Sequence, residues 1–296
     1  MASNLFQERS LDQAIIAGII AGSAEVAVTY PLEYHKVRAQ LPPQLLAKVG
    51  RPGLTTKLFR GCGTMITGNA VKTVVRFGTF DFLSRQLQDE NGIVSAPMSL
   101  AAGLAAGFIE STILVPFELA KVRQISSLTP NGVGTTATFK RIYQLHGVTG
   151  FTYGFMPTLL RQGMASAVRF TAYNGIKQLV QGFVPPGERL SGEWTTAIEL
   201  LSSYAAVIST MPIDVVKTRM ETLSGRIAAK SRSSHCLMQI FFQEGFSKLF
   251  SGTLPRLLKV TVSTAVIFSF YQSAIQGVSI LDKLQLGKAK PNADND

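Results

Sequence analysis

Five basic side chains recur at matched positions of a repeated unit, where they could bind an anion. Glycines Gly61, Gly154 and Gly252 mark the same register in each unit, and positions seven, eleven and fifteen residues later lie one helical turn apart. These positions hold Lys72, Arg76, Arg161, Arg169 and Lys259. Since arginine offers a planar fork and lysine a mobile point charge, the set suits a compact polyanion with several carboxylate or phosphate groups.

If these bases lie in a membrane, their surroundings are restricted. A charge at the centre of a span costs about 2.5 to 3.5 kcal/mol, so five bases facing lipid would together cost more than about 12 kcal/mol. They must therefore face water or acidic groups. An alternative to ligand binding is a structural network with Glu25, Glu110 and Glu199, but three acids cannot neutralise five bases. We favour a substrate site on a water-filled cavity.

A second set of charges follows three prolines. The pattern Pro-x-acid-x-x-Lys-x-Arg begins at Pro31, Pro116 and Pro212, so the chain consists of three related units. Its acids and lysines are Glu33, Lys36, Glu118, Lys121, Asp214 and Lys217. Within one motif the acid and lysine could pair at i and i+3, worth a few tenths of a kcal/mol. Proline kinks that bring three helix ends together would instead let each acid meet the lysine of another unit, closing a ring of ion pairs.

Six apolar segments must position these side chains. They span residues 12–38, 62–87, 97–124, 156–182, 195–221 and 254–280. At about 1.5 Å per residue each can cross about 30 Å of hydrocarbon, and only helices satisfy the backbone of such runs in lipid. We predict an all-α membrane protein with six transmembrane helices. It forms one domain, 1–296, of three pseudo-symmetric repeats at about 11–90, 96–184 and 194–280.

Composition and loop charge agree with this fold. The chain is 46% hydrophobic and 16% charged, against about 25% charged for an average soluble domain. Its net charge of +11 does not indicate nucleic-acid binding, because many bases lie inside apolar segments. The motif-side loops, 41–60, 127–152 and 224–251, carry a net +9, and the connections on the other side −3, so the two sides face different compartments.

Other features of the sequence play smaller parts. Apolar periodicity at 139–143 and 236–242 predicts short surface helices in the long loops. Cys62, Cys236 and the histidines lack metal-ligand spacing, so we expect neither a metal nor another cofactor. Residues 1–11 contain a single arginine, so we expect no cleavable presequence and an internal targeting signal.

The threefold motif and its apolar segments resemble the mitochondrial carrier family, over about residues 11–280. The resemblance implies a multi-pass inner-membrane transporter, functional as a monomer among lipids, with its long loops in the matrix. It also implies that the motif charges form a matrix gate. The second charge network of the family, on the even helices, is poorly kept here, because only Asp81 and Lys177 remain charged. A weak cytosolic gate of this kind should open at low cost.

Three segments resemble the citrate, or tricarboxylate, carriers of fungal mitochondria. They are residues 69–77, 164–169 and 209–214. The pair Arg161 and Gln162 is similar to the contact point that carboxylate carriers have on their fourth helix. This resemblance implies a substrate with several carboxylates, held in part by these two side chains.

The sixth helix departs from that pattern. Arg256 and Lys259 stand where tricarboxylate carriers have two arginines. The resemblance implies an antiporter, not an enzyme, that exchanges citrate, isocitrate or cis-aconitate for another di- or tricarboxylate. A carrier of dicarboxylates, oxoacids or phosphate is an alternative, and so is a non-transporting adaptor or an anion channel.

Overall fold

The computed structural model describes residues 11–49, 58–87, 96–126, 134–183, 191–222 and 233–266. Its long helices are α2 (Leu11–Gln40), α4 (Cys62–Gln86), α5 (Ala96–Ile125), α7 (Phe155–Gln181), α8 (Gly192–Thr222) and a helix over 253–266. The five named helices begin and end within three residues of the predicted apolar segments. The rest of the sixth predicted segment, beyond residue 266, lies outside the described residues.

The long helices form a ring. Helix α4 packs between α2 and α5, α5 contacts α7, and α7 packs against α8. The helix over 253–266 packs on α8 through Leu257 and Val260, and it returns to α2 where the Ser263 hydroxyl donates to Glu25 Oε1 at 2.6 Å. Each helix therefore has a face toward the inside of the ring.

Close packing of α4 depends on glycines. A Cβ at Gly22 of α2 would lie 2.6 Å from Asn69 Nδ2, and one at Gly68 of α4 would lie 2.9 Å from the Cβ of Phe117 in α5. Without side chains at these points, α4 can approach both neighbours. This packing sets the rotation of α4 about its axis, and with it the direction of the bases one and two turns further along.

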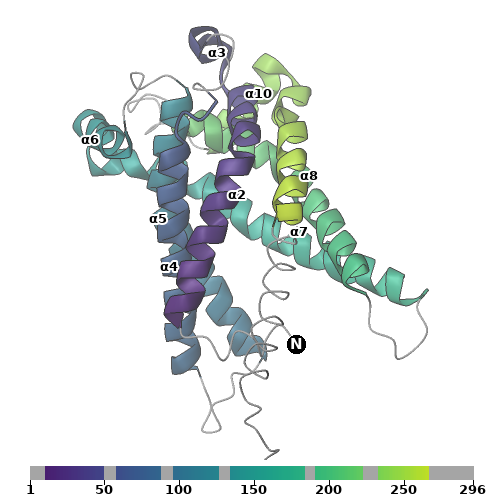
Figure 1. The fold of residues 1–296 in the computed structure, drawn as a ribbon. Coiled ribbons are helices and arrows are strands. Elements are labelled where there is room, and N and C mark those ends of the chain that lie inside the picture. Colours follow the sequence, from purple (N-terminus) through teal and green to yellow (C-terminus); the bar gives the residue numbers. More distant parts are fainter. Residues whose placement is uncertain are drawn as a thin grey trace, which may run out of the picture.

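Three short helices cover one end of the ring, the upper end in Figure 1. They are α3 (Pro43–Val49), α6 (Thr135–His146) and α10 (Ser233–Glu244), and each follows a helix that carries a proline motif, α2, α5 or α8. Helices α6 and α10 occupy the two surface segments predicted from apolar periodicity. Toward the opposite end, α7 and α8 diverge from α2, α4 and α5 (Figure 1).

The three motif prolines lie inside α2, α5 and α8, not at their ends. Each removes one backbone hydrogen bond from its helix, two residues before the motif acid. The helices continue for about two and a half turns beyond the proline, as far as Gln40, Ile125 and Thr222. The motif charges therefore lie on helical backbone near the end that the short helices cover.

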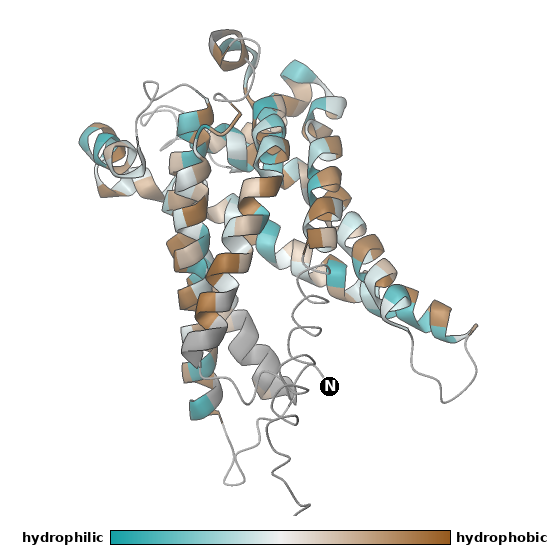
Figure 2. Ribbon diagram, in the orientation of Figure 1, coloured by the Kyte–Doolittle hydropathy of each residue, from teal (hydrophilic) through white to brown (hydrophobic). Residues whose placement is uncertain are grey.

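The outer surface of the ring is rich in apolar side chains. Ile16, Ile20 and Val28 of α2, Phe82 of α4 and Ile208 of α8 are all exposed, and Figure 2 shows apolar stretches along every long helix. By length and composition, α8 is long and apolar enough to cross a membrane. Such a surface suits contact with lipid and not with water.

A charged cavity as the candidate binding site

A cavity of about 1940 Å³ lies between the long helices. All of the predicted substrate-binding residues line it: Lys72, Arg76, Arg161, Gln162, Arg169, Arg256 and Lys259. The six motif charges line it as well. Among the described residues, nine basic and seven acidic side chains border the cavity, an excess of two positive charges. A cavity of this charge attracts anions.

The motif charges form three ion pairs, and each pair joins two repeats. Lys121 binds Glu33 at 2.7 Å, Lys36 binds Asp214 at 2.6 Å, and Lys217 binds Glu118. Unit one is thus linked to unit two, unit two to unit three, and unit three back to unit one. Pairing within a motif, the alternative considered from the sequence, is not found among the motif residues, all of which the structure describes. The closed ring ties together the ends of α2, α5 and α8.

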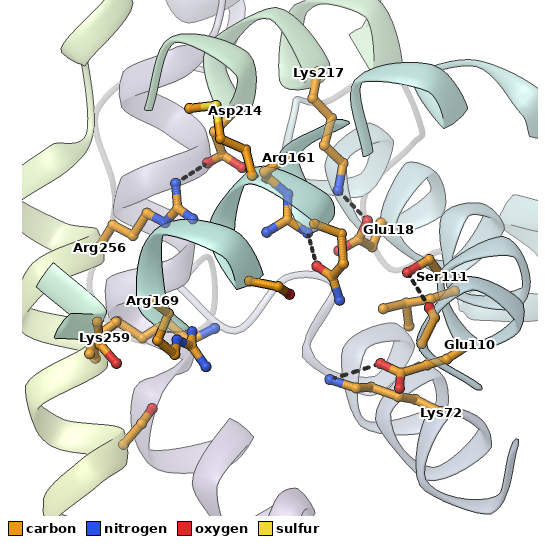
Figure 3. A pocket seen from close by; sticks show the side chains of 18 of the residues that line it. Lys72, Glu110, Ser111, Glu118, Arg161, Arg169, Asp214, Lys217, Arg256 and Lys259 are labelled. Atoms are coloured by element: carbon orange, nitrogen blue, oxygen red, sulfur yellow. Dashed lines mark hydrogen bonds and ion pairs between the residues drawn. The ribbon is translucent and has the colours of Figure 1, made fainter. Parts of the chain in front are cut away.

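Two acids of the ring also bind bases from the cavity. Asp214 lies 3.5 Å from Arg161 Nε and 3.6 Å from Arg256 Nη1, and Glu33 Oε2 accepts a hydrogen bond from Lys259 Nζ at 3.0 Å. Both acids are buried. Figure 3 shows Arg161 and Arg256 converging on Asp214 from α7 and the last described helix. The ring and the predicted binding site therefore share charges.

The bases of α4 have a different partner. Lys72 Nζ lies 3.4 Å from Glu110 Oε1 (Figure 3). Arg76 Nε lies 3.8 Å from Glu110 Oε2. Pairing of the cavity bases with acids of the odd segments was the alternative to ligand binding, and at Glu110 such pairing is present. It is not found at Glu25 or Glu199, which make no ion pair in the part of the chain that the structure describes.

Arg169 stands apart from the other bases. It is exposed on α7 at the cavity wall, and no acidic side chain in the described ranges lies within ion-pair distance of it. Two turns earlier on the same helix, Arg161 donates a long hydrogen bond of 3.4 Å to Gln162 Oε1. Arg169 is therefore the cavity base whose charge is most available to a ligand.

Sequence reasoning missed the polar contacts that support the ring. Gln40 is fully buried, donates to Asp214 Oδ2 at 3.1 Å and accepts from the Thr218 hydroxyl at 2.7 Å. Arg219, the last residue of the third motif, binds both oxygens of Glu244 at 2.7 and 2.8 Å and so ties α10 to α8. The motif arginine could have indicated such a contact, whereas nothing in the pattern singled out Gln40.

No comparable ring is seen at the opposite end among the described residues. Asp81 pairs with Arg85, one turn away on α4, at 2.9 Å, and no ion pair joins it to Lys177 of α7. The sixth predicted segment beyond residue 266, which would supply the third position of the second network, lies outside the described residues. The described residues thus agree with the expectation from the sequence that this network is poorly kept.

Three related helix pairs around one charged cavity, tied at one end by inter-repeat ion pairs, define a solute carrier of threefold internal symmetry. The chain matches the family described as mitochondrial carrier protein over residues 7–91, 94–183 and 197–279, and it belongs to that family. It is accordingly a multi-pass transporter of the mitochondrial inner membrane.

Relatives within the family carry names that specify a cargo. The chain is 40% identical to the mitochondrial citrate transporter A of Aspergillus niger over 277 residues, which is 91% of this chain and 93% of that protein. It is 34% identical to the tricarboxylate transport protein of Saccharomyces cerevisiae, over 88% of this chain and 94% of that protein. It is 31% identical to the human mitochondrial tricarboxylate transport protein, covering 89% of both.

Proposed function

We propose that this carrier exchanges a tricarboxylate, of the citrate, isocitrate or cis-aconitate type, for another di- or tricarboxylate by alternating access. The observation that carries the proposal is the convergence of six bases from three helices on one cavity. One carboxylate can engage only one or two of these bases at a time, whereas three carboxylates can engage bases on all three helices together. The names of the relatives support the same class of cargo.

The shared charges suggest how cargo binding acts on the ring. Carboxylates that bind Arg161, Arg256 or Lys259 compete directly with Asp214 and Glu33 for these bases. Each charge-assisted hydrogen bond is worth about 1.5 to 3 kcal/mol, so the ligand can weaken the ring by a comparable amount. A ligand shifts a conformational equilibrium only by such a difference in affinity between two states.

The contacts of Arg161 support the same role. Arg161 is largely buried, and its Nε lies 3.5 Å from Asp214 Oδ1 but makes no hydrogen bond in the described part of the chain. A buried N–H group without a hydrogen bond costs free energy. A carboxylate that binds Arg161 would offer its guanidinium a better-placed acceptor, in keeping with a role of Arg161 in binding.

Exchange in liposomes tests the proposed function. Purified carrier in liposomes should take up labelled citrate only when the lumen contains citrate or a dicarboxylate such as malate. A channel would admit citrate into empty liposomes, and a non-transporting adaptor would show no uptake under either condition. A carrier for phosphate or oxoacids would exchange those anions in preference to citrate.

Lys259→Arg is expected to change the ratio of citrate to cis-aconitate exchange more than it changes total activity. Lysine leaves more room than arginine and demands less planarity, while the two acids differ in shape and in one hydroxyl. Initial exchange rates of both acids in the wild type and the variant measure the ratio. Lys140→Arg on α6, outside the cavity, is the control and should leave it unchanged. An unchanged ratio in Lys259→Arg would show that this helix does not distinguish the two acids.

A further inference from the structure

A fourth acid lies beside the ring, and the ion pairs described so far do not explain it. Glu221, near the end of α8, is 1% exposed, and its Oε1 has no hydrogen-bond partner in the described residues. Its closest base is Lys217, at 3.9 Å, and Lys217 already binds Glu118. Leaving one oxygen of a buried carboxylate without a hydrogen bond costs free energy. Such a group calls for an explanation beyond this one conformation.

The threefold repeat shows that the acid is specific to one unit. Nine residues after the motif proline, the three units have Gln40, Ile125 and Glu221. Gln40 bridges two polar side chains, whereas Ile125 lies in an apolar cluster. Only the third unit places a carboxylate one turn beyond its motif lysine, on the same helical face.

The surroundings of Glu221 hold it next to the ring. From its own helix Lys217 and Asp214 act on it electrostatically, and Glu118 and Lys121 do so from α5. On the α7 side, a Cβ at Gly154 would lie 3.0 Å from Glu221 Cγ.

Two further bases complete these surroundings, Arg123 of α5 and Arg161 of α7. The side chain borders the cavity, with the start of α7 on one side and the Lys217 ammonium on the other.

The three ion pairs of the ring, here called its corners, differ in which additional charged group lies beside them. At two corners the acid has a second base, since Asp214 lies near Arg161 and Arg256, and Glu33 binds Lys259. The third acid, Glu118, has no cavity base within ion-pair distance among the described residues. At this corner the additional group is an acid, Glu221, and it lies near the lysine of the pair, Lys217.

From this arrangement we infer that Glu221 is the alternative partner of Lys217, which pairs with it when the ring opens and Lys217 leaves Glu118. The move needs only a change of side-chain rotamer, because both residues are on α8. Lys217 thus keeps a counter-charge in the open state, which lowers the cost of opening the corner between units two and three. The inference rests on the proposed gate function of the ring.

A double-mutant cycle between Glu118 and Glu221 tests this inference through stability. Glutamine at position 221 keeps the shape of the side chain, so Glu221→Gln should leave the thermal unfolding temperature of the purified carrier unchanged or slightly raised. In the Glu118→Gln background the same change should lower it clearly, because Lys217 then loses both partners. Glu244→Gln, which removes a nearby acid that binds Arg219, is the matched control and should add independently to Glu118→Gln. Additive effects of Glu118→Gln and Glu221→Gln would overturn the inference.

Exchange rates give a second measurement, which separates charge from shape. Glu221→Gln should lower the maximal exchange rate roughly tenfold, in line with one lost charge-assisted contact in the open state. Glu221→Asp keeps the charge and should retain more exchange than Glu221→Gln, although it changes the shape more. The reverse order, or a lower unfolding temperature in Glu221→Gln alone, would indicate a purely structural role.

Lys217→Gln distinguishes failure of this inference from failure of the proposed gate. Normal exchange in Lys217→Gln would mean that this corner does not act in transport, and the proposed gate would fail with it. Impaired exchange in Lys217→Gln, together with independent effects of the two acids, would leave the gate in place and remove only the role of Glu221.

Discussion

Replacing Arg169 with alanine is expected to lower the apparent affinity for the tricarboxylate by about one to two decades, without loss of folding. Arg169 has no acidic partner in the described part of the chain, so its removal takes a contact from the ligand and none from the protein. Removing Lys72, Arg76 or Arg161 should reduce exchange by a similar factor. Arg161→Ala should in addition destabilise the ring, because Asp214 loses a neighbouring base.

Initial rates of citrate exchange over a range of concentrations, together with thermal unfolding, measure these effects. Arg141→Ala, on the exposed face of α6, is the control and should exchange like the wild type. Near-normal exchange in both Arg76→Ala and Arg169→Ala would refute the placement of the binding site on this face of the cavity.

Reversing one charge of the ring, as in Lys121→Glu, is expected to abolish most exchange. Lys121 and Glu33 are both buried and lie 2.7 Å apart, and breaking a buried ion pair typically costs about 3 to 5 kcal/mol. Two acids would then face each other across the corner between units one and two. Both the exchange rate and the unfolding temperature should fall.

Adding Glu33→Lys to Lys121→Glu should restore part of the exchange, because the pair is re-formed with opposite polarity. Rescue should be incomplete, since the new lysine would lie near Lys259, which binds Glu33 in the wild type. Pairing within a motif makes a different prediction, namely rescue by Glu118→Lys. If only that second combination regained activity, the ring between repeats would not be the functional arrangement.

The two sets of variants probe charges that the binding site and the ring share. Asp214 and Glu33 each belong to the ring and each bind a cavity base. On the proposed function, a ligand that takes these bases would therefore act directly on the ring. Glu118 lacks this link among the described residues, and in the proposed role of Glu221 it is Lys217 that changes partner at this ion pair. The threefold scaffold thus has an asymmetric site, as expected for an asymmetric ligand.

Much of this architecture could be predicted from the sequence because it depends on local periodicity. Apolar runs long enough to cross a bilayer located five described helices to within three residues. Spacing by four placed Lys72 and Arg76 on one face of α4, and the cost of exposing charge to lipid directed that face inward. The recurrence of the proline motif alone established the three repeats.

The partners of the charges were decided by the tertiary structure. Periodicity defines a face of a helix, but the height and rotation of one helix against another depend on packing between repeats, as where Gly22 meets Asn69. From sequence, a motif acid could equally pair within its helix, and Glu25 could equally be a partner of the cavity bases. Only the tertiary structure shows that Glu25 accepts a hydrogen bond from Ser263. It also shows that Asp214 binds Lys36 of another repeat while it lies next to Arg161 of the cavity.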